Sequence, residues 1–315
     1  LYNGNSDAKA DCLNLLGVVF VRLGDFASGV TYTKQCLDIE LKSGDNDRIA
    51  SSFSTLAGTY IAAEDPNAAL KYSLQGLKYA DKARNSLRKT ILMGMASEAY
   101  YKKGEYEKAV KYADEAYRID SIDDRQNRAA IRLSQKATAL VGLGEYAEAE
   151  TTFLKAFPIL IKSNNYHSLA IDYNQLGFML LKQKRNKDAI KYFLEASKLF
   201  DKMGDLYNQV HSQRGLYESY WNINPDSAHI ALQKFNVLKD SLYREASADA
   251  LARYKVEFET DRLKEEVNEH ISNRKRDFVI GGILLFICVV GGFALYRWRI
   301  KRYRREMQSL MAKIK

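Results

Sequence analysis

The stretch ATALVGLGEYAEAETTFLKA, residues 137–156, decides the fold. In its middle lies the pair Gly144-Glu145. Glycine adopts the left-handed conformation that ends a helix, and a carboxylate is favourable where the next helix begins. The residues on either side of the pair include the small Ala137, Ala149 and Ala156 and the large apolar Leu140. The stretch therefore predicts two helices that cross closely and are joined by a tight turn.

Four positions of this stretch recur every forty residues over five copies, without an insertion. The first column is small: Gly17, Ala57, Ser97, Ala137 and Gly177. The second, three residues later, is large and apolar: Phe20, Tyr60, Tyr100, Leu140 and Leu180. The other two are small: Gly29, Ala69, Ala109, Ala149 and Ala189, and then Cys36, Gly76, Ala116, Ala156 and Ala196. We therefore predict stacked helical hairpins, in which small residues permit a close crossing and the large residue fills the gap between hairpins.

Turn residues separate the two helices of each predicted hairpin. In the fifth copy the turn is Lys184-Arg185-Asn186, and we expect Asn186 to be its left-handed residue. A sixth, degenerate hairpin ends near Leu242, and its turn, at Asn224-Pro225-Asp226, is shifted by about one residue. Atypical units are expected at the end of a stack. The turns of the other copies are Gly24-Asp25, Asp65-Pro66, Gly104-Glu105 and Gly144-Glu145.

These residues resemble the tetratricopeptide repeat, whose pattern runs Leu-Gly, an aromatic, Gly-Asp/Glu-Tyr, and two alanines. The first copy reads Leu16-Gly17…Phe20…Gly24-Asp25-Phe26…Gly29…Cys36, and the third reads Tyr100…Gly104-Glu105-Tyr106…Ala109…Ala116. The resemblance implies an all-α, right-handed superhelical solenoid over residues 1–242. The period departs from the family's usual length of about 34 residues, so we expect longer helices. The proline that commonly follows the second helix is missing.

The composition agrees with a folded helical protein, because 46% of the residues are hydrophobic and only three are proline. The net charge of +9 is concentrated at the C-terminus. Residues 297–315 hold eight Lys/Arg and one Glu, which gives +7 and leaves +2 for residues 1–296. We therefore expect the repeat array not to bind nucleic acid, and direct binding by the basic tail is the weakest of our hypotheses.

No catalytic, cofactor-binding or metal-binding motif is found, so we expect a protein that is not an enzyme. The four histidines lack ligand neighbours at helical spacing, and there is no phosphate loop or nucleophile elbow. Cys12, Cys36 and Cys288 are too widely spaced for a zinc site. A Cys12–Cys36 bridge stays possible in an oxidising compartment, whereas the simpler interpretation makes both residues small packing residues.

Residues 278–296, FVIGGILLFICVVGGFALY, contain no charged residue and predict one transmembrane helix. Nineteen helical residues span about 29 Å, close to the hydrocarbon thickness of a bilayer. Tyr296 and Trp298 lie at the far end, where amphipathic aromatic residues meet the membrane surface. The glycines at 281–282 and 291–292 give a weak signal for a homodimer through the span.

The charges that flank this segment predict its orientation. Residues 297–305 are strongly basic, whereas the basic cluster 274–276 is preceded by acidic residues. The C-terminal side should therefore be cytoplasmic, and the array external or periplasmic, in a bacterial inner-membrane protein. The chain does not begin with Met, no capping helix or signal peptide precedes its first repeat, and its last helix ends without a cap or breaker, so we expect a fragment of a longer protein.

Two helical linkers flank the span. Residues 243–277 predict a charged helical stalk, either rigid or part of a coiled coil. In residues 297–315 the apolar side chains follow a three-four spacing that suits a juxtamembrane coiled coil, although a basic helix on anionic lipid would look similar. This order of parts resembles bacterial membrane-anchored regulators with an external repeat sensor and a cytoplasmic kinase or DNA-binding output. The stretch Leu238–Leu242 contributes to that resemblance.

The register of the repeats predicts a binding groove on the first helices of successive hairpins. Its middle is apolar and aromatic, and about half of its residues are expected to pack between hairpins. The co-chaperone type of carboxylate clamp lacks its lysines here, because the corresponding positions hold Asn14, Ser54, Gly94, Ser134 and Asn174. The groove residues are Val21, Ile61, Ile91, Glu98, Tyr101, Ile131, Val141, Ile171, Phe178, Leu181, Arg214 and Trp221.

The first functional hypothesis is a membrane-anchored sensor or regulator that binds a protein or peptide in this groove. It would couple that binding to a cytoplasmic output through the membrane helix. The alternative is a static membrane scaffold for complex assembly. The sequence names neither the ligand nor the oligomeric state.

Overall fold

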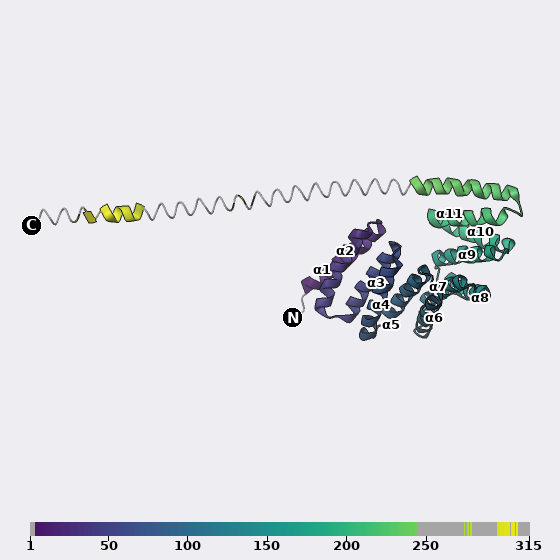
Figure 1. The fold of residues 1–315 in the computed structure, drawn as a ribbon, viewed down its shortest axis with the longest axis horizontal. Coiled ribbons are helices and arrows are strands. Elements are labelled where there is room, and N and C mark those ends of the chain that lie inside the picture. The colour runs from purple at the N-terminus through teal and green to yellow at the C-terminus, as the bar shows by residue number, and fades with distance from the viewer. Residues whose placement is uncertain are drawn as a thin grey trace, which may run out of the picture. The chain divides into compact units, whose positions relative to one another are not determined.

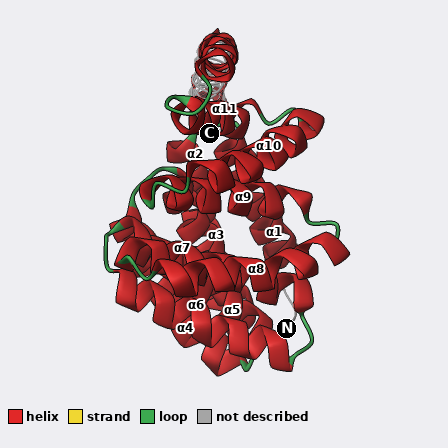
Figure 2. Cartoon of the chain, turned by 90° about the vertical axis from the view of Figure 1, so that its right-hand side faces the viewer, coloured by secondary structure: helices red, strands yellow, loops and turns green. Residues whose placement is uncertain are grey.

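The computed structural model describes residues 4–244, 274, 276, 278, 295–302, 304, 305 and 307. Contacts divide the chain into two units, residues 1–242 and residues 243–315. All regular structure in the described part is helical, as Figures 1 and 2 show. The expected all-helical repeat solenoid is confirmed, whereas its right-handed sense stays a prediction.

The first unit is a row of helical hairpins. Its helices α1 to α11 have 15–19 residues, and helical residues continue from 225 to 244. Two helices of 17 or 18 residues and two short turns account for the forty-residue period. The bounds are α1 Gly4–Arg22, α2 Phe26–Ser43, α3 Asn46–Ala62, α4 Pro66–Ala83, α5 Ser86–Lys102, α6 Tyr106–Ile122, α7 Gln126–Leu143, α8 Tyr146–Lys162, α9 Tyr166–Lys182, α10 Asn186–Met203 and α11 Leu206–Tyr220.

A left-handed residue recurs every twenty residues and ends each helix from α1 to α10. The residues that precede second helices are Gly24, Glu64, Gly104, Gly144 and Lys184, and those that precede first helices are Gly44, Arg84, Asp124, Asn164 and Gly204. At every one of these turns except that of Gly44, the next amide donates to a carbonyl five residues earlier, as in Glu105 N–H to Tyr100 O at 2.9 Å. The prediction for Asn186 was wrong. Lys184 has φ 61° at the position that the period assigns, and Asn186 is the first residue of α10.

The small columns lie where the two helices of a hairpin cross, as the sequence predicts. In the first hairpin, a Cβ added to Gly17 would lie 2.3 Å from Thr33 Oγ1, and one added to Gly29 would lie 2.7 Å from Val21 Cγ2. In the third hairpin, Ser97 donates a hydrogen bond of 2.8 Å to the Ala109 carbonyl across the crossing. Larger side chains in these columns would separate the helices.

The column of large residues packs within hairpins, a role that the sequence interpretation missed. Its rings contact a tyrosine of the partner helix, with centroids 5.2–5.3 Å apart: Phe20–Tyr32 and Tyr60–Tyr72 are stacked, and Tyr100–Tyr112 is tilted. The largest buried cluster lies further along, around Phe153, Leu176 and Phe193. From α7 onward, this cluster is shared by successive hairpins, as expected in a solenoid.

The first helices form the inner layer of the array. Each of α1, α3, α5, α7 and α9 contacts the next first helix of the row, whereas no two second helices among α2, α4, α6, α8 and α10 contact each other. Hairpins packed closely on one side and spaced apart on the other must curve toward the close side. The inner face is therefore the exposed face of the first helices, where the sequence predicts the groove.

The predicted stalk (243–277), transmembrane helix (278–296) and juxtamembrane segment (297–315) lie mostly outside the described residues. Residues 295–302 are helical. In the described part of the chain, no helix is both long enough and apolar enough to cross a membrane.

Candidate functional site

The predicted groove residues lie on the first helices, from Val21 on α1 to Arg214 on α11, with Trp221 directly after α11. Ten of the twelve are half-buried, and Arg214 and Trp221 are exposed. Ile61, Tyr101, Val141 and Leu181 form one forty-residue column, and Ile91, Ile131 and Ile171 form another. Because successive first helices contact one another, these columns form continuous apolar rows along the inner face. Their use as a binding groove stays a prediction.

Aromatic and charged contacts fix the later part of the inner face. The Phe178 ring meets the Phe193 ring edge-on, with centroids 4.8 Å apart, and the Arg214 guanidinium lies 5.6 Å from the Phe178 centroid. Arg214 also donates to Glu218 at 2.8 Å. The edge-on contact of Tyr217 with Trp221 holds the exposed indole at 5.5 Å. This end of the inner face therefore presents an aromatic surface beside an ion pair.

Beneath the apolar rows, polar side chains link neighbouring first helices. Ser134 of α7 donates to the buried carboxylate of Asp172 on α9 at 2.5 Å. Ser212 of α11 donates to the Asn174 side-chain oxygen on α9 at 2.8 Å. One junction earlier, the guanidinium of Arg132 lies against Gly94. The three donors or acceptors Arg132, Asp172 and Ser212 share one forty-residue column, so these contacts repeat along the array.

A buried ionic cluster joins α5, α6 and α7. Asp120 is fully buried and accepts hydrogen bonds from Thr90 at 2.8 Å and from Arg125 Nε at 2.7 Å. Its second oxygen faces Arg132 Nε at 3.5 Å. Asp120 thus balances two arginines, and removing it would leave buried positive charge without a partner.

Burial changes the ionisation of three groups in this region. Burial raises the pKa of Asp172 to about 7, although the Ser134 hydrogen bond opposes the rise. Burial also raises the pKa of Glu98, against the opposing charges of Lys102 and Arg132. Burial and the positive charge of Arg214 lower the pKa of His211. Asp172 therefore titrates near neutral pH, directly below the inner face.

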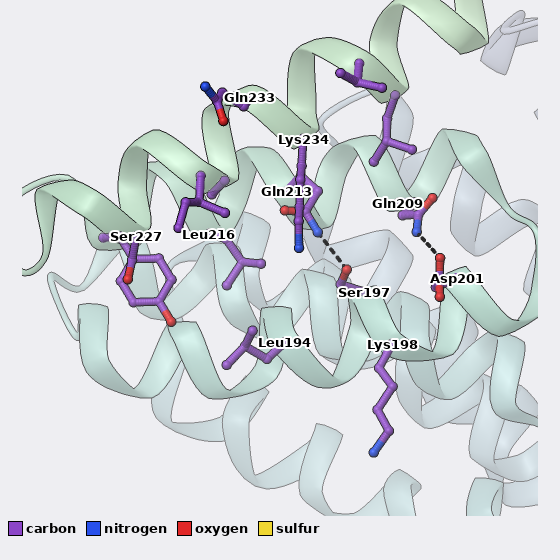
Figure 3. Close-up of a pocket in the computed structure, with 15 residues that line it drawn as sticks. Leu194, Ser197, Lys198, Asp201, Gln209, Gln213, Leu216, Ser227, Gln233 and Lys234 are labelled. Atoms are coloured by element: carbon purple, nitrogen blue, oxygen red, sulfur yellow. Dashed lines mark hydrogen bonds between the residues drawn. The ribbon is translucent and has the colours of Figure 1, made fainter.

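A pocket opens at the end of the array, where the sequence analysis predicted no site. It has a volume of about 840 Å³ and is lined by α10, α11 and the helical segment 225–244. Figure 3 shows two hydrogen bonds inside it: Gln213 donates to Ser197 Oγ at 2.8 Å, and Gln209 donates to Asp201 at 2.9 Å. The degenerate sixth hairpin was the only signal of this pocket in the sequence.

The cysteines and histidines form no cluster in the described residues. Cys12 is exposed and free, and Cys36 is buried, with its sulfur 3.4 Å from Ser52 Oγ. His167 contacts Asp205 at 3.2 Å on the surface. Within the part of the chain that the structure describes, no group of three metal-ligating side chains is brought together.

Comparisons with known proteins identify the repeat. Residues 92–123 and residues 127–202 match two sequence models of the tetratricopeptide repeat. The first segment covers most of α5 and all of α6, and the second runs from the start of α7 almost to the end of α10. A comparison with curated protein sequences finds no match for the chain.

Solved structures share the fold at low sequence identity. The apo form of RapI aligns with a TM-score of 0.63 and 16% identity, over 76% of this chain and 85% of RapI. A Rap protein complexed with competence and sporulation factor aligns at 0.51 and 16%, over 75% of this chain and 65% of that chain. PilF of Pseudomonas aeruginosa aligns at 0.53 and 18%, over 78% of this chain and 99% of PilF. The first unit therefore has the fold of a tetratricopeptide-type array.

Proposed function

We propose that this chain is a helical-repeat binding protein that takes a peptide or an extended protein segment along its inner face. The observation that carries the proposal is a pair of apolar rows, one on α3, α5, α7 and α9 and the other on α5, α7 and α9, which follow successive contacting helices. A surface of this kind suits the side chains of an extended segment or of an amphipathic helix. The complex of a Rap protein with competence and sporulation factor supports the proposal, because a protein of this fold was captured with a bound factor.

We further propose that residues 278–296 tether the array to a membrane and that the chain acts as a sensor or regulator. The support is the uncharged run of nineteen residues with basic residues behind it. Binding on the array would then be coupled to the cytoplasmic side through the membrane helix. The static scaffold is the alternative, and it uses the same surface without transmitting a signal.

Selection from a displayed random peptide library tests the binding surface. The full chain should enrich a related set of sequences, and Val141→Lys should weaken their binding at least tenfold, because it adds a charge to an apolar row. Leu154→Lys is the matched control. Leu154 is 47% exposed on α8, a second helix, so this variant should bind like the wild type. Equal binding by all three proteins would contradict the proposal.

Labelling of single cysteines in intact cells tests the tether. After the native thiols are removed, one cysteine replaces Lys187 on α10 and another replaces Lys313. A membrane-impermeant reagent, used after outer-membrane permeabilisation where needed, should label only position 187. Labelling of position 313 alone would invert the topology, and labelling of both in sealed cells would exclude a membrane crossing between them.

A further inference from the structure

The pocket at the end of the array exists because an apolar contact is replaced by a polar one. At earlier junctions, the column of Ser197 holds Leu37, Leu77, Tyr117 and Phe157, and the column of Gln213 holds Phe53, Met93, Leu133 and Tyr173. Phe157 and Tyr173 meet edge-on with centroids 4.9 Å apart. Ser197 and Gln213 join by one hydrogen bond instead, and they leave the volume of two large side chains unfilled.

A large residue on the last helical segment should hold this segment further from α11 than a regular second helix lies. The Ala228 N–H donates to the Asn224 carbonyl, and the Ala189 N–H donates to the Arg185 carbonyl at the start of α10. Because these two bonds are equivalent, each residue of the last segment corresponds to the residue 39 positions earlier in α10. In this register, Phe235 occupies the column of Ala196. That column is a close approach, because a Cβ on Gly76 would lie 2.8 Å from Phe53 Cβ. A phenyl ring there requires a wider spacing and opens the pocket.

The pocket faces a different direction from the inner face. On α11 it is lined by Gln209, Gln213, Leu216 and Tyr220, whereas the inner face carries Arg214 and Trp221. At 3.6 residues per turn, the two sets are separated by about 120° around the helix axis. A ligand in the pocket therefore leaves the inner face free.

The lining of the pocket combines exposed apolar residues with polar residues and two lysines, Lys198 and Lys234. Leu194 on α10, and Ile230 and Val237 on the last segment, are 47%, 54% and 63% exposed. In Figure 3 the Lys234 side chain overlaps Gln213 in projection, whereas Gln233 and Lys198 point away from Gln213. Among the described residues, no carboxylate lies within ion-pair distance of Lys234, and Asp201 already accepts the Gln209 amide. The pocket therefore offers exposed apolar side chains beside Lys234, a positive charge with no ion-pair partner among the described residues.

We propose that this pocket is a second binding site, which takes an amphipathic helix of a partner protein with one carboxylate between its apolar residues. The carboxylate pairs with Lys234, and the apolar residues contact Leu194, Ile230 and Val237. Ile230 and Val237 are seven residues apart, or about 10 Å along the axis, which matches two turns of a docked helix. The pocket's volume of about 840 Å³ accommodates its inserted side chains.

Two fluorescent peptides test the site on the full chain in phosphatidylcholine nanodiscs, with empty nanodiscs subtracted. One is a sixteen-residue helix with leucine at helical spacing and glutamate elsewhere, and the other replaces glutamate with lysine. The wild type should prefer the acidic peptide at least tenfold, and Lys234→Glu should reverse the preference. Lys155→Glu is the matched control, because Lys155 holds the equivalent exposed position on α8, where the next hairpin is regular.

Two further variants separate this site from loss of folding and from the inner face. Ser197→Phe restores the aromatic residue of the preceding junction and should abolish acidic-peptide binding without lowering the thermal unfolding midpoint. Val141→Lys should leave that binding unchanged even if no inner-face ligand exists, because this site does not rest on the function proposed above. The proposal is overturned if the acidic peptide does not bind, if Lys155→Glu acts like Lys234→Glu, or if Val141→Lys abolishes binding.

Discussion

Gly94 of α5 leaves the space that the Arg132 guanidinium of α7 occupies. A Cβ at residue 94 would lie 1.9 Å from Arg132 Nη1, and Gln135 of α7 donates to the Gly94 carbonyl at 3.3 Å. The glycine thus admits a buried cation beneath the inner face. Arg132 in turn faces Asp120 at 3.5 Å. The absence of a side chain at Gly94 therefore allows the ionic cluster of α5, α6 and α7 to form.

Gly94→Ala should therefore destabilise the array by about 1–3 kcal/mol, because the methyl group displaces the guanidinium from its place near Asp120. The measurement is urea unfolding of the full chain in detergent, monitored by circular dichroism. Gly58→Ala is the matched control on α3, since its nearest atom would be Met95 Cε at an ordinary 3.6 Å. This control should gain about 0.5–1 kcal/mol from helix propensity. Equal losses in both variants would contradict the explanation.

Asp120→Ala should cost about 3–5 kcal/mol, because the buried Arg132 would keep its positive charge without an anion, whereas Arg125 would still pair with Asp123 at 2.6 Å. The same unfolding measurement applies. Asp188→Ala serves as the control. It removes a carboxylate that is 54% exposed and paired with Arg185, so its loss should not exceed about 1 kcal/mol. A small effect of Asp120→Ala would show that the cluster contributes little to stability.

Asp172 should make the stability of the array depend on pH. Its pKa is raised to about 7, whereas an unfolded Asp titrates near 3.9, so between these values the folded chain binds more protons than the unfolded chain. The free energy of unfolding from this group therefore falls as pH rises from about 4 to 7. Asp172→Asn should remove this fall and exceed the wild type by roughly 1–3 kcal/mol at pH 8.

Unfolding titrations at pH 5, 6, 7 and 8 check the Asp172 prediction. Asp38→Asn, at an exposed position of α2, is the matched control and should leave the wild-type pH profile unchanged. A parallel profile for Asp172→Asn and the wild type would show that Asp172 stays ionised throughout.

Lys184→Gly should stabilise the array by about 1 kcal/mol, because Lys184 holds a left-handed backbone at φ 61° that costs an ordinary residue strain. The neighbouring Gln183, with φ −83°, provides the contrast. Gln183→Gly should destabilise by about 0.5–1 kcal/mol, because it only adds freedom to the unfolded chain. Thermal unfolding of both variants checks the opposite signs.

The hairpins could be predicted from sequence because their determinants are local and periodic. A small residue such as Ala57 is required wherever two helices cross, so the period exposes it. The Asn186 prediction failed because residue preference was given more weight than the period, which places a left-handed residue at 184. The pairing of Phe20 with Tyr32 was missed because the forty-residue period shows that a position is large but does not show which residue of the partner helix it contacts.

The candidate sites were less accessible to sequence reasoning. The positions of the inner-face residues follow from the period, but their half-buried state depends on how closely successive first helices approach. The pocket forms because Ser197 stands where earlier hairpins have a large side chain, and Phe235 stands where they have a small one. A replacement in a column indicates that a junction is irregular, yet only the packed structure shows the resulting cavity.

The separation of the second helices has a mechanical consequence. The first helices contact one another in succession, whereas the second helices do not. We therefore expect neighbouring hairpins to rotate relative to each other about the contact between their first helices. Small rotations at successive junctions add up over the row. We therefore expect the array to deform elastically. Its curvature would change to accommodate ligands of different length, while each hairpin stays rigid.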